Sequence, residues 1–478
     1  MPGNAMNNAA PAPETSGLKI ETRTIHPVPL DERHGKAWHL GPFWFTGNFV
    51  LTTMVTGFVG PALGLAAWQA VLAILLGVAL GTLCMALHAN QGPRLGLPQM
   101  IQSRAQFGLR GAVLPFMAVV CVYIGFNVFN VILATDALTT VLPGSDAFWY
   151  ALLIAVAVVI AVVGHDLLHT VQRWLTYLLI GVFGLLTLAA LLLLEADTVQ
   201  RQLQFSWSGF LIQLSAAAGY QISYSVYVSD YSRYLPPSTS ARKVVLWTYL
   251  GAAGSAVWLM SLGALVASAV VAPEAISSLQ HLGNRFLPGF GTFAILMAVP
   301  ALVGIMAVNC YGALLTGISA ITAFRPLAPG LAGRALGLGG IGAVVYLTAI
   351  ALPDSYLDSF NLFLQLMLYV LVPWSAINLT DYYLLRKGNY VIPAMFDPAG
   401  EYGQWAWAGI LAYLGGLLAM LPFVSLAGVQ GPVAVALSGA DLAFVPGFIV
   451  SALLYWLLMR HLPGTPPPPV AERKAPQP

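Results

Sequence analysis

The chain has 478 residues, of which 58% are hydrophobic and 8% are charged. A water-soluble domain carries roughly 25% charged residues, so this composition excludes an ordinary soluble protein. The net charge of +2 is too small to indicate nucleic-acid binding. The three cysteines lie far apart, without the spacing of a disulfide framework or a metal site.

Long apolar runs follow one another along the chain. No Asp, Glu, Lys or Arg occurs from Phe286 to Phe324 or from Tyr402 to Ala440. A helix crosses the hydrocarbon core with about 20 apolar residues, and runs of this length favour helices over barrel strands. We therefore predict an all-α polytopic membrane protein. The twelve expected transmembrane helices span about residues 42–66, 68–89, 112–141, 148–164, 174–195, 207–229, 244–272, 290–323, 335–352, 356–379, 405–427 and 442–461.

The distribution of Lys and Arg predicts the orientation of these helices. With the amino terminus inside, 18 of the 20 basic residues fall on cytoplasmic segments, and Arg201 and Arg285 fall outside. The positive-inside rule predicts such a skew, and one miscounted helix would invert every later loop. We expect a multi-pass protein of the inner (cytoplasmic) membrane with both termini in the cytoplasm.

Interruptions in the first and sixth helices indicate an internal repeat. Residues 47–61 contain three glycines and Pro61 beside three threonines, and Gly219 precedes a run of amide and hydroxyl side chains. This spacing fits two inverted five-helix repeats, in which sites form where paired helices are unwound at mid-membrane. Alternatively, the small residues serve helix packing. We divide the chain into a cytoplasmic tail (1–39), two five-helix repeats (40–203 and 204–390), two additional transmembrane helices (391–461) and a second cytoplasmic tail (462–478).

Polar and aromatic side chains on the third and eighth helices are candidate binding residues. Tyr123 and Asn127 are four residues apart and share a helix face. A ring beside a carboxamide suits a flat heterocycle, because the ring stacks and the amide reads donor and acceptor edges. Asn309 lies in an uncharged run where an unpaired amide is costly. Interhelical packing and hydrogen bonding remain an alternative for each residue.

The sixth helix offers a further group of candidates. Gly219 is followed by Tyr220 and Gln221. If the helix breaks at this point, the freed backbone groups and the Gln221 amide face a central cavity; otherwise these residues join helices together.

Charged pairs stand at the predicted cytoplasmic ends of two helices. Asp230 precedes Arg233 after the sixth helix, and Asp381 precedes Arg386 after the tenth. Each pair is either a gating element or an interfacial anchor. The sequence contains no nucleophile elbow, no phosphate-binding glycine loop and no metal-spaced cluster, so we expect no enzyme, no cofactor and no bound metal.

Several segments resemble the nucleobase:cation symporter-1 family, in its purine/cytosine permease branch. The resemblance runs from about Glu32 to Tyr390 and rests on "WFTGNFVLTTMVTGFVGPALGL", "GLPQMIQSRAQFGLRGAVLP", "YIGFNVFN", "VSDYSRYLP", "NCYGALLTGIS" and "NLTDYYLLRKGNY". It implies a LeuT-like fold and uptake of a nucleobase or related heterocycle with a cation by alternating access. It also implies that Tyr123 stacks on the substrate and that Asn127 and Asn309 supply amides. The implied contacts on the sixth helix are Gly219, Tyr220 and Gln221, and those on the first are Thr52, Thr53 or Thr56.

One departure from the family pattern concerns the coupling cation. Sodium-coupled relatives carry hydroxyl residues before the amide of the eighth helix, where this chain has Val303 and Gly304. These residues offer no side-chain oxygen to a hard cation, which favours proton over sodium coupling.

The leading hypothesis is therefore a proton-driven importer of a purine or cytosine. Allantoin, hydantoin or a pyrimidine vitamin precursor is an alternative cargo, since such molecules are also flat and rich in hydrogen-bonding groups. A membrane sensor that binds such a ligand without moving it is the alternative from another class. The expected partners are the small molecule and the lipid bilayer, with no nucleic acid and no evident obligate protein partner.

Overall fold

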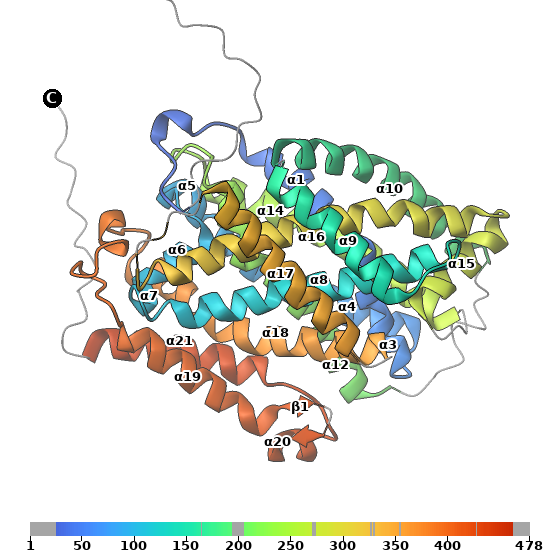
Figure 1. The fold of residues 1–478 in the computed structure, drawn as a ribbon. Helices are drawn as coiled ribbons and strands as arrows, with labels where there is room; N and C mark the ends of the chain where they lie inside the picture. Colours follow the sequence, from blue (N-terminus) through green and yellow to red (C-terminus); the bar gives the residue numbers. More distant parts are fainter. Residues whose placement is uncertain are drawn as a thin grey trace, which may run out of the picture.

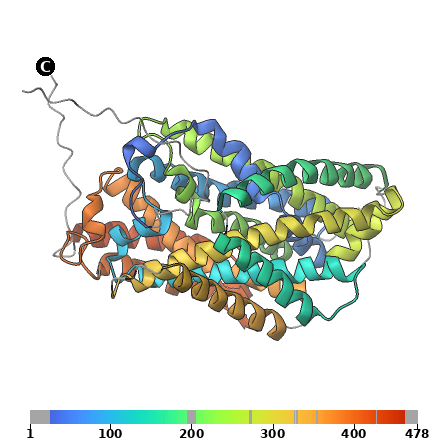
Figure 2. The ribbon, with the colours of Figure 1, turned by 45° about the horizontal axis from the view of Figure 1, so that its top comes forward.

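The computed structural model describes residues 25–163, 165–193, 205–269, 274–325, 327, 330–352, 355–426 and 428–461. Its long helices lie alongside one another in a single bundle (Figures 1 and 2). Most of the predicted amino-terminal tail, residues 1–24, and the predicted carboxy-terminal tail lie outside the described residues.

The first half of the described chain forms helices and short 3-10 turns. They are η1 (Leu30–Glu32), η2 (Ala37–His39), α1 (Leu40–Asn48), α2 (Leu51–Val55), η3 (Thr56–Phe58), α3 (Val59–Ala62), α4 (Ala67–Ala89), α5 (Gln91–Leu95), α6 (Gln99–Gln102), α7 (Arg104–Phe107), α8 (Val113–Thr139), α9 (Asp146–Val163) and α10 (His165–Leu193).

The second half adds more helices and a two-stranded antiparallel hairpin. Its elements are α12 (Trp207–Ser223), η4 (Tyr224–Val226), α13 (Val228–Ser232), α14 (Ala241–Ala269), α15 (Ala275–Phe286), α16 (Phe290–Ile321), α17 (Leu331–Ala351), α18 (Tyr356–Leu379), the π-helical η5 (Thr380–Leu385), η6 (Ile392–Met395), α19 (Trp407–Met420), η7 (Leu421–Phe423), β1 (Ser425–Leu426), β2 (Val429–Gln430), α20 (Pro432–Ala436) and α21 (Phe444–His461).

The apolar helices coincide with the predicted spans. Among the described residues, eight helices are long and apolar enough to cross a membrane, and two shorter apolar helices occupy Asp146–Val162 and Trp407–Phe423. The predicted spans that this criterion omits are the first and the sixth. The structure divides both into short pieces, α1–α3 and α12–α13. The predicted all-α class of membrane fold is confirmed, and the short β1–β2 hairpin is an addition to it.

The first span breaks between α1 and α2, within its predicted interrupted segment. Phe49 leaves helical geometry with φ −91° and ψ 67°, and Val50 is extended with φ −133° and ψ 160°. The carbonyl groups at the end of α1 then lack their usual helical donors. The Thr53 hydroxyl donates to one of them, the Asn48 carbonyl oxygen, at 2.7 Å.

The sixth span breaks later than the sequence suggests. We expected the interruption at Gly219, but α12 stays helical through this residue and ends at Ser223. The chain departs from helical geometry at Tyr227, with φ −139° and ψ 6°. Gly219 serves packing instead, because a Cβ there would lie 2.6 Å from the carbonyl oxygen of Leu364 on α18.

The helices pack as two groups joined by α18. In the first group α4 packs against α12 and α14, and α1 packs against α14. In the second, α16 packs against α8 and α9, and α17 packs against α9. α18 contacts α12 of one group and α8 of the other. Its outer flank is covered by α19 and α21, which run side by side (Figure 1).

Glycines allow the closest approaches inside the first group. A Cβ on Gly77 of α4 would lie 2.3 Å from the Leu214 carbonyl oxygen, and one on Gly81 would lie 2.4 Å from the Ala218 carbonyl oxygen. Both carbonyls belong to α12. Small residues are favoured at such membrane-helix contacts, since they let backbones meet.

Some elements were not predicted. α15 lies in a segment that we expected to be a loop, and α5, α6 and α7 lie between the second and third spans. The β1–β2 hairpin and α20 connect α19 with α21. These elements are short or polar, so the apolar pattern of a transmembrane helix does not mark them.

Candidate functional site

The two predicted amides of the third and eighth helices meet in the structure. Asn309 Nδ2 on α16 donates to Asn127 Oδ1 on α8 at 3.1 Å. Asn127 Nδ2 donates in turn to the Met306 carbonyl oxygen and to Cys310 Sγ, both at 3.1 Å. Asn127 and Asn309 are 1% and 5% exposed. The pair forms a buried polar group in an apolar helix interface.

Tyr123 lies one turn before Asn127 and faces the sixth span. Its ring stacks on that of Tyr227, with centroids 5.8 Å apart and planes inclined by 28°. On its other side it rests against α16, where a Cβ on Gly312 would lie 2.6 Å from Tyr123 Cζ. Because Gly312 has no side chain, the Tyr123 ring fits between α16 and the break of the sixth span at Tyr227.

Hydroxyl groups of the broken first span contact both helix groups. The hydroxyls of Thr53 and Tyr220 lie 2.7 Å apart, which connects α2 with α12. The Thr52 hydroxyl donates to Asn130 Oδ1 on α8. Phe126 of α8 packs edge-on against the Tyr220 ring, with centroids 5.5 Å apart. The threonines of α2 thus lie between the sixth span and the helix that carries Tyr123 and Asn127.

The structure places two predicted residues, Gly219 and Gln221, away from this group. Gly219 faces the backbone of α18. Gln221 faces α4, where its Oε1 accepts from the Thr82 hydroxyl at 3.3 Å and its Cβ lies close to Gly81. Thr56, at the start of η3, is buried, and its hydroxyl donates to the Thr52 carbonyl oxygen of α2 at 3.1 Å. Since neighbouring helical residues point in different directions, Tyr220 faces the site while Gly219 and Gln221 do not.

Tyr220 begins an aromatic row on the sixth span, and the other two members, Tyr224 and Tyr227, were not predicted as part of the site. Tyr224 packs against both Tyr220 and Tyr227, with centroids 5.9 Å and 5.5 Å away. Tyr227 also lies near Trp44 of α1, with centroids 6.0 Å apart. The spacing of residues 220, 224 and 227 is that of one helix face, and this periodicity is the sequence signal for the row. The row leads from Thr53 to the Tyr123 ring.

The predicted gating pair lies at the end of α13. Asp230 Oδ1 accepts from the backbone nitrogen of Gln99 at 2.7 Å, which joins the sixth span to α6. Arg233 Nε donates to the Asp230 carbonyl oxygen at 3.2 Å, and its guanidinium lies over the Tyr234 ring. Both residues connect the end of the sixth span to neighbouring loop segments, and gating stays a prediction.

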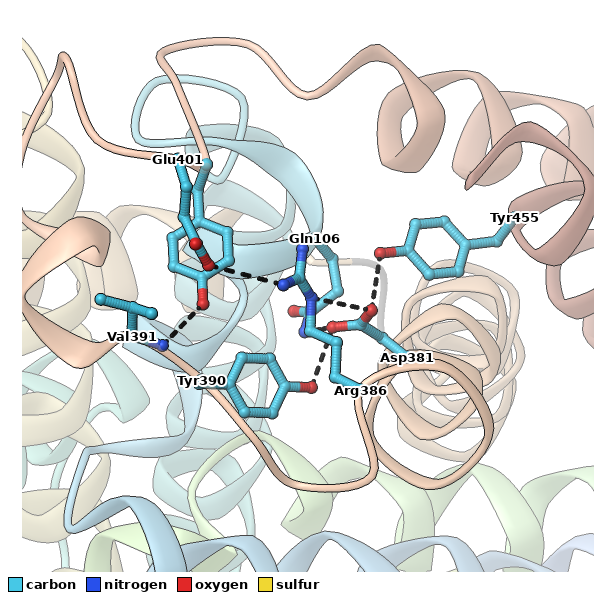
Figure 3. Close-up of polar contacts among 8 residues, drawn as sticks. Gln106, Asp381, Arg386, Tyr390, Val391, Glu401 and Tyr455 are labelled. Atoms are coloured by element: carbon cyan, nitrogen blue, oxygen red, sulfur yellow. Dashed lines mark hydrogen bonds and ion pairs between the residues drawn. The ribbon is translucent and has the colours of Figure 1, made fainter. Parts of the chain in front are cut away.

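The second charged pair is the centre of a buried cluster (Figure 3). Asp381 is fully buried, and its Oδ1 lies 3.3 Å from Arg386 Nε. Its carboxylate also accepts from Gln106 Nε2 of α7 at 2.7 Å, from the Tyr390 hydroxyl at 2.8 Å and from the Tyr455 hydroxyl of α21 at 3.1 Å. Burial, and then the charge of Asp381, raises the pKa of the Tyr390 phenol well above its ordinary value, so that the hydroxyl remains a donor.

The buried cluster around Asp381 and Arg386 joins several elements around the end of α18. Arg386 reaches a second carboxylate, with 3.6 Å between its Nη1 and Glu401 Oε1, and its guanidinium lies over the Tyr402 ring. The elements connected are η5, α7, α21 and the segment before α19. A buried ion pair with this many hydrogen bonds fixes the end of α18.

Val303 and Gly304 lie within the continuous helix α16, and both are buried. α16 contacts α2 of the broken first span. Neither residue supplies a side-chain oxygen, which is what a hard cation prefers as a ligand. Val303 and Gly304, which occupy the positions of the sodium-site hydroxyl residues of relatives, therefore offer no side-chain ligand where α16 meets α2.

Comparisons with known proteins agree with the fold and the sequence motifs. A family described as permease for cytosine/purines, uracil, thiamine, allantoin matches residues 27–447. YxlA of Bacillus subtilis, which bears the name of a purine-cytosine permease, is 37% identical over 93% of this chain and 96% of its own length. The purine-cytosine permease fcyB of Emericella nidulans is 26% identical over 92% of this chain and 88% of its own length.

A solved structure with the same fold is that of Mhp1, a nucleobase-cation-symport-1 family transporter with bromovinylhydantoin bound. It superimposes with a TM-score of 0.72 at 19% identity and covers 92% of this chain and 95% of that one. The match confirms the predicted fold class.

Proposed function

The chain belongs to the family of permeases for cytosine/purines, uracil, thiamine and allantoin, and we propose that it imports a purine or cytosine together with a proton. It is a membrane transporter and not an enzyme. We place both of its termini in the cytoplasm, in accord with the distribution of its basic residues.

The observation that carries the choice of cargo is the meeting of a ring and two amides. Tyr123 lies one turn from Asn127, and Asn127 is hydrogen-bonded to Asn309. A nucleobase offers a flat π face to the ring and alternating donors and acceptors to the amides. When a base enters, its donors and acceptors form hydrogen bonds with the two amides in place of the hydrogen bond between Asn309 and Asn127. The amides thus exchange one partner for another and neither is left unsatisfied.

Binding of a flat ring at Tyr123 requires the sixth span to move. Tyr227 now stacks directly on Tyr123, so a base that takes this place must part the two rings. Tyr227 lies at the break of the sixth span, where the backbone already departs from helical geometry. The hinge for this movement is therefore next to the ring that must be displaced.

We further propose that alternating access arises from movement of one helix group against the other. Tyr123, Asn127 and Asn309 belong to the group formed by α8, α9, α16 and α17, and the broken spans pack with α4 and α14. A tilt of one group against the other opens the site to one side of the membrane at a time.

Transport is tested with the purified full-length protein in proteoliposomes. Uptake of labelled cytosine, adenine, guanine and hypoxanthine is measured with a proton gradient or a sodium gradient, each imposed alone. We expect accumulation with the proton gradient and none with sodium. Accumulation driven by sodium alone would contradict the proton part of the proposal and leave the cargo standing.

Other cargoes are separated by competition. Allantoin, hydantoin and pyrimidine vitamin precursors are also flat, and the family description includes allantoin, uracil and thiamine. Each is added in excess to labelled cytosine. If no nucleobase competes and one of the other ligands binds instead, that ligand replaces the purine or cytosine. Binding without accumulation under either gradient would favour the sensor.

A further inference from the structure

His88 is a buried histidine outside the site described above. It lies near the end of α4 and is fully buried. Its ring stacks flat on the indole of Trp374 on α18, with centroids 4.9 Å apart and planes inclined by 15°. The backbone of the same residue contacts the sixth span, because the Ser229 hydroxyl of α13 donates to the His88 carbonyl oxygen at 3.0 Å. The residue thus lies where α4, α13 and α18 meet.

The hydrogen bonds of His88 define which nitrogen is able to accept a proton. Nδ1 lies 2.7 Å from the Cys84 carbonyl oxygen. A carbonyl accepts and cannot donate, so the neutral ring carries its hydrogen on Nδ1 and a lone pair on Nε2. Nε2 is buried and has no hydrogen-bond partner in the described part of the chain. It is therefore the basic atom of this ring.

Trp374 is held in place from its other edge. Its indole nitrogen donates to the Ser103 hydroxyl at 2.9 Å, and the side chain is 1% exposed. The indole is consequently fixed flat against the imidazole. A cation over the face of a Trp ring is attracted by the ring quadrupole, more strongly when water is excluded. Protonation of His88 would therefore tighten the contact between α4 and α18.

The charged groups on the elements around His88 already have other partners. Asp230 of α13 accepts from the backbone of Gln99, and Arg233 donates to the Asp230 carbonyl oxygen. Asp381 of η5 pairs with Arg386. On α5 the guanidinium of Arg94 reaches Asn389, and on α7 that of Arg104 reaches the Ser319 carbonyl oxygen. Arg242 and Lys243, at the start of α14, are exposed.

The uncharged titratable neighbours are occupied as well. The Tyr383 hydroxyl donates to the Leu87 carbonyl oxygen at 2.8 Å, and the Tyr224 hydroxyl contacts the Gly47 carbonyl oxygen at 3.4 Å. Cys84 lies on α4 itself, and its carbonyl oxygen contacts His88 Nδ1. Within the described residues, no carboxylate forms an ion pair with the imidazole. The contact that responds to the charge of His88 is therefore the Trp374 ring.

We propose that His88 carries the coupling proton on Nε2 and that its protonation controls the contact between α4 and α18. The inference rests on the proposed proton symport and assigns its carrier. His88 lies at the predicted cytoplasmic end of α4, so a proton from the outer solution reaches it through the site once that site is open outward, and the proton then forms the Nε2–H bond. The Nδ1–H group keeps its hydrogen bond to the Cys84 carbonyl oxygen. When α18 parts from α4 towards the cytoplasm, the Nε2–H bond breaks and the proton passes to water. No other co-reactant is needed.

The experiment compares exchange with driven accumulation in proteoliposomes. The proteins are the wild type, His88→Gln and the control His281→Gln, whose histidine is exposed on α15. Exchange of labelled cytosine is measured with cytosine and equal pH on both sides, and it shows that a variant is folded and binds cargo. Accumulation is measured with the inside one pH unit more alkaline, which supports about a tenfold concentration ratio for one proton per cargo.

We expect wild type and His281→Gln to accumulate cytosine under the pH gradient. His88→Gln should exchange cytosine but reach a concentration ratio near one. Its exchange should also lose the pH dependence of the wild type, which loss of a packing contact alone does not produce. Accumulation by His88→Gln at the wild-type ratio would overturn the proposal. Absence of exchange in the wild type with every nucleobase would instead contradict the proposed cargo.

If His88→Gln does not fold, the variant Trp374→Phe tests whether a protonated His88 is stabilised by the Trp374 ring. Trp374→Phe keeps a planar ring but has a weaker π face and no donor to Ser103. Loss of this stabilisation should move the pH midpoint of accumulation downward by about half a unit to one unit. A midpoint equal to that of the wild type would count against a protonated His88 on the Trp374 ring.

Discussion

Asn309 on α16 donates a hydrogen bond to Asn127 on α8, with 3.1 Å between Nδ2 and Oδ1. The two residues are far apart in the chain and lie in separate predicted repeats, yet each is the partner that the other needs in an apolar interface. Their mutual hydrogen bond satisfies both amides, and in the proposed function a nucleobase edge offers the same donors and acceptors.

Asn309→Ala should weaken cytosine binding. Loss of a buried hydrogen-bonding partner costs about 1–3 kcal/mol, which corresponds to an increase of the dissociation constant by about 5- to 150-fold. The dissociation constant is measured with purified protein in detergent. Asn284→Ala is the matched control. Asn284 lies on α15, and its Oδ1 accepts from the backbone nitrogen of Gly291 at the start of α16, the helix that carries Asn309. Equal affinities of Asn309→Ala and wild type would remove Asn309 from the site.

Tyr123→Ala should reduce binding through loss of stacking, while Tyr123→Phe should keep most of it. Stacking of a base on an aromatic side chain contributes about 1–3 kcal/mol. The Phe variant retains the π face next to Tyr227 and loses the hydroxyl alone. Competition binding of cytosine gives both affinities. If the Phe and Ala variants lose affinity equally, the hydroxyl and not the ring makes the decisive contact.

Gly263→Ala should lower thermal stability. A Cβ there would lie 2.0 Å from the Met54 carbonyl oxygen, at the contact between α14 and α2. Overpacking of this kind costs about 1–3 kcal/mol, and α2 would be pushed away from α14. Gly254→Ala on the same helix is the control, because its nearest neighbour would lie at 3.9 Å. Thermal denaturation of the two variants should differ, and equal midpoints would refute the close contact.

Asp381→Asn should destabilise the protein, because the buried Arg386 loses its buried partner and keeps only the partly exposed Glu401. Removal of one member of a buried ion pair costs about 3–5 kcal/mol. The double variant Asp381→Leu, Arg386→Met should be more stable than the single one, since no uncompensated charge remains. Asp397→Asn, in an exposed position, is the control. Thermal denaturation gives the order of stability, and a single variant as stable as the wild type would show that the pair does not anchor α18.

Most of the fold could be predicted from apolar length and charge. The spans of α4, α8, α14 and α16 follow from runs of apolar residues that a membrane requires. The break of the first span was expected within its glycine- and threonine-rich segment and lies there, at Phe49 and Val50. The break of the sixth span was expected at Gly219 and lies at Tyr227, because glycine marks a close helix contact as well as a bend.

The candidate site was predictable in part. The spacing of Tyr123 and Asn127 and the uncharged surroundings of Asn309 indicated the ring and both amides as candidates, but not that the two amides bond to each other. The direction of Gln221 and the stacking partner of Tyr123 were not predictable, since both depend on how α12 is rotated against α4 and α8.

The sequence by itself determined that the chain is a bundle of membrane helices, since hydrocarbon admits few ways to satisfy a backbone. Its motifs, by their resemblance to the nucleobase:cation symporter-1 family, indicated the relation to nucleobase permeases. The tertiary structure decided which side chains meet: Asn127 with Asn309, Tyr123 with Tyr227, and His88 with Trp374. These contacts join helices that are distant in the chain. Their geometry depends on helix rotation and close approach, which the packing of small residues sets and the hydrophobic pattern does not.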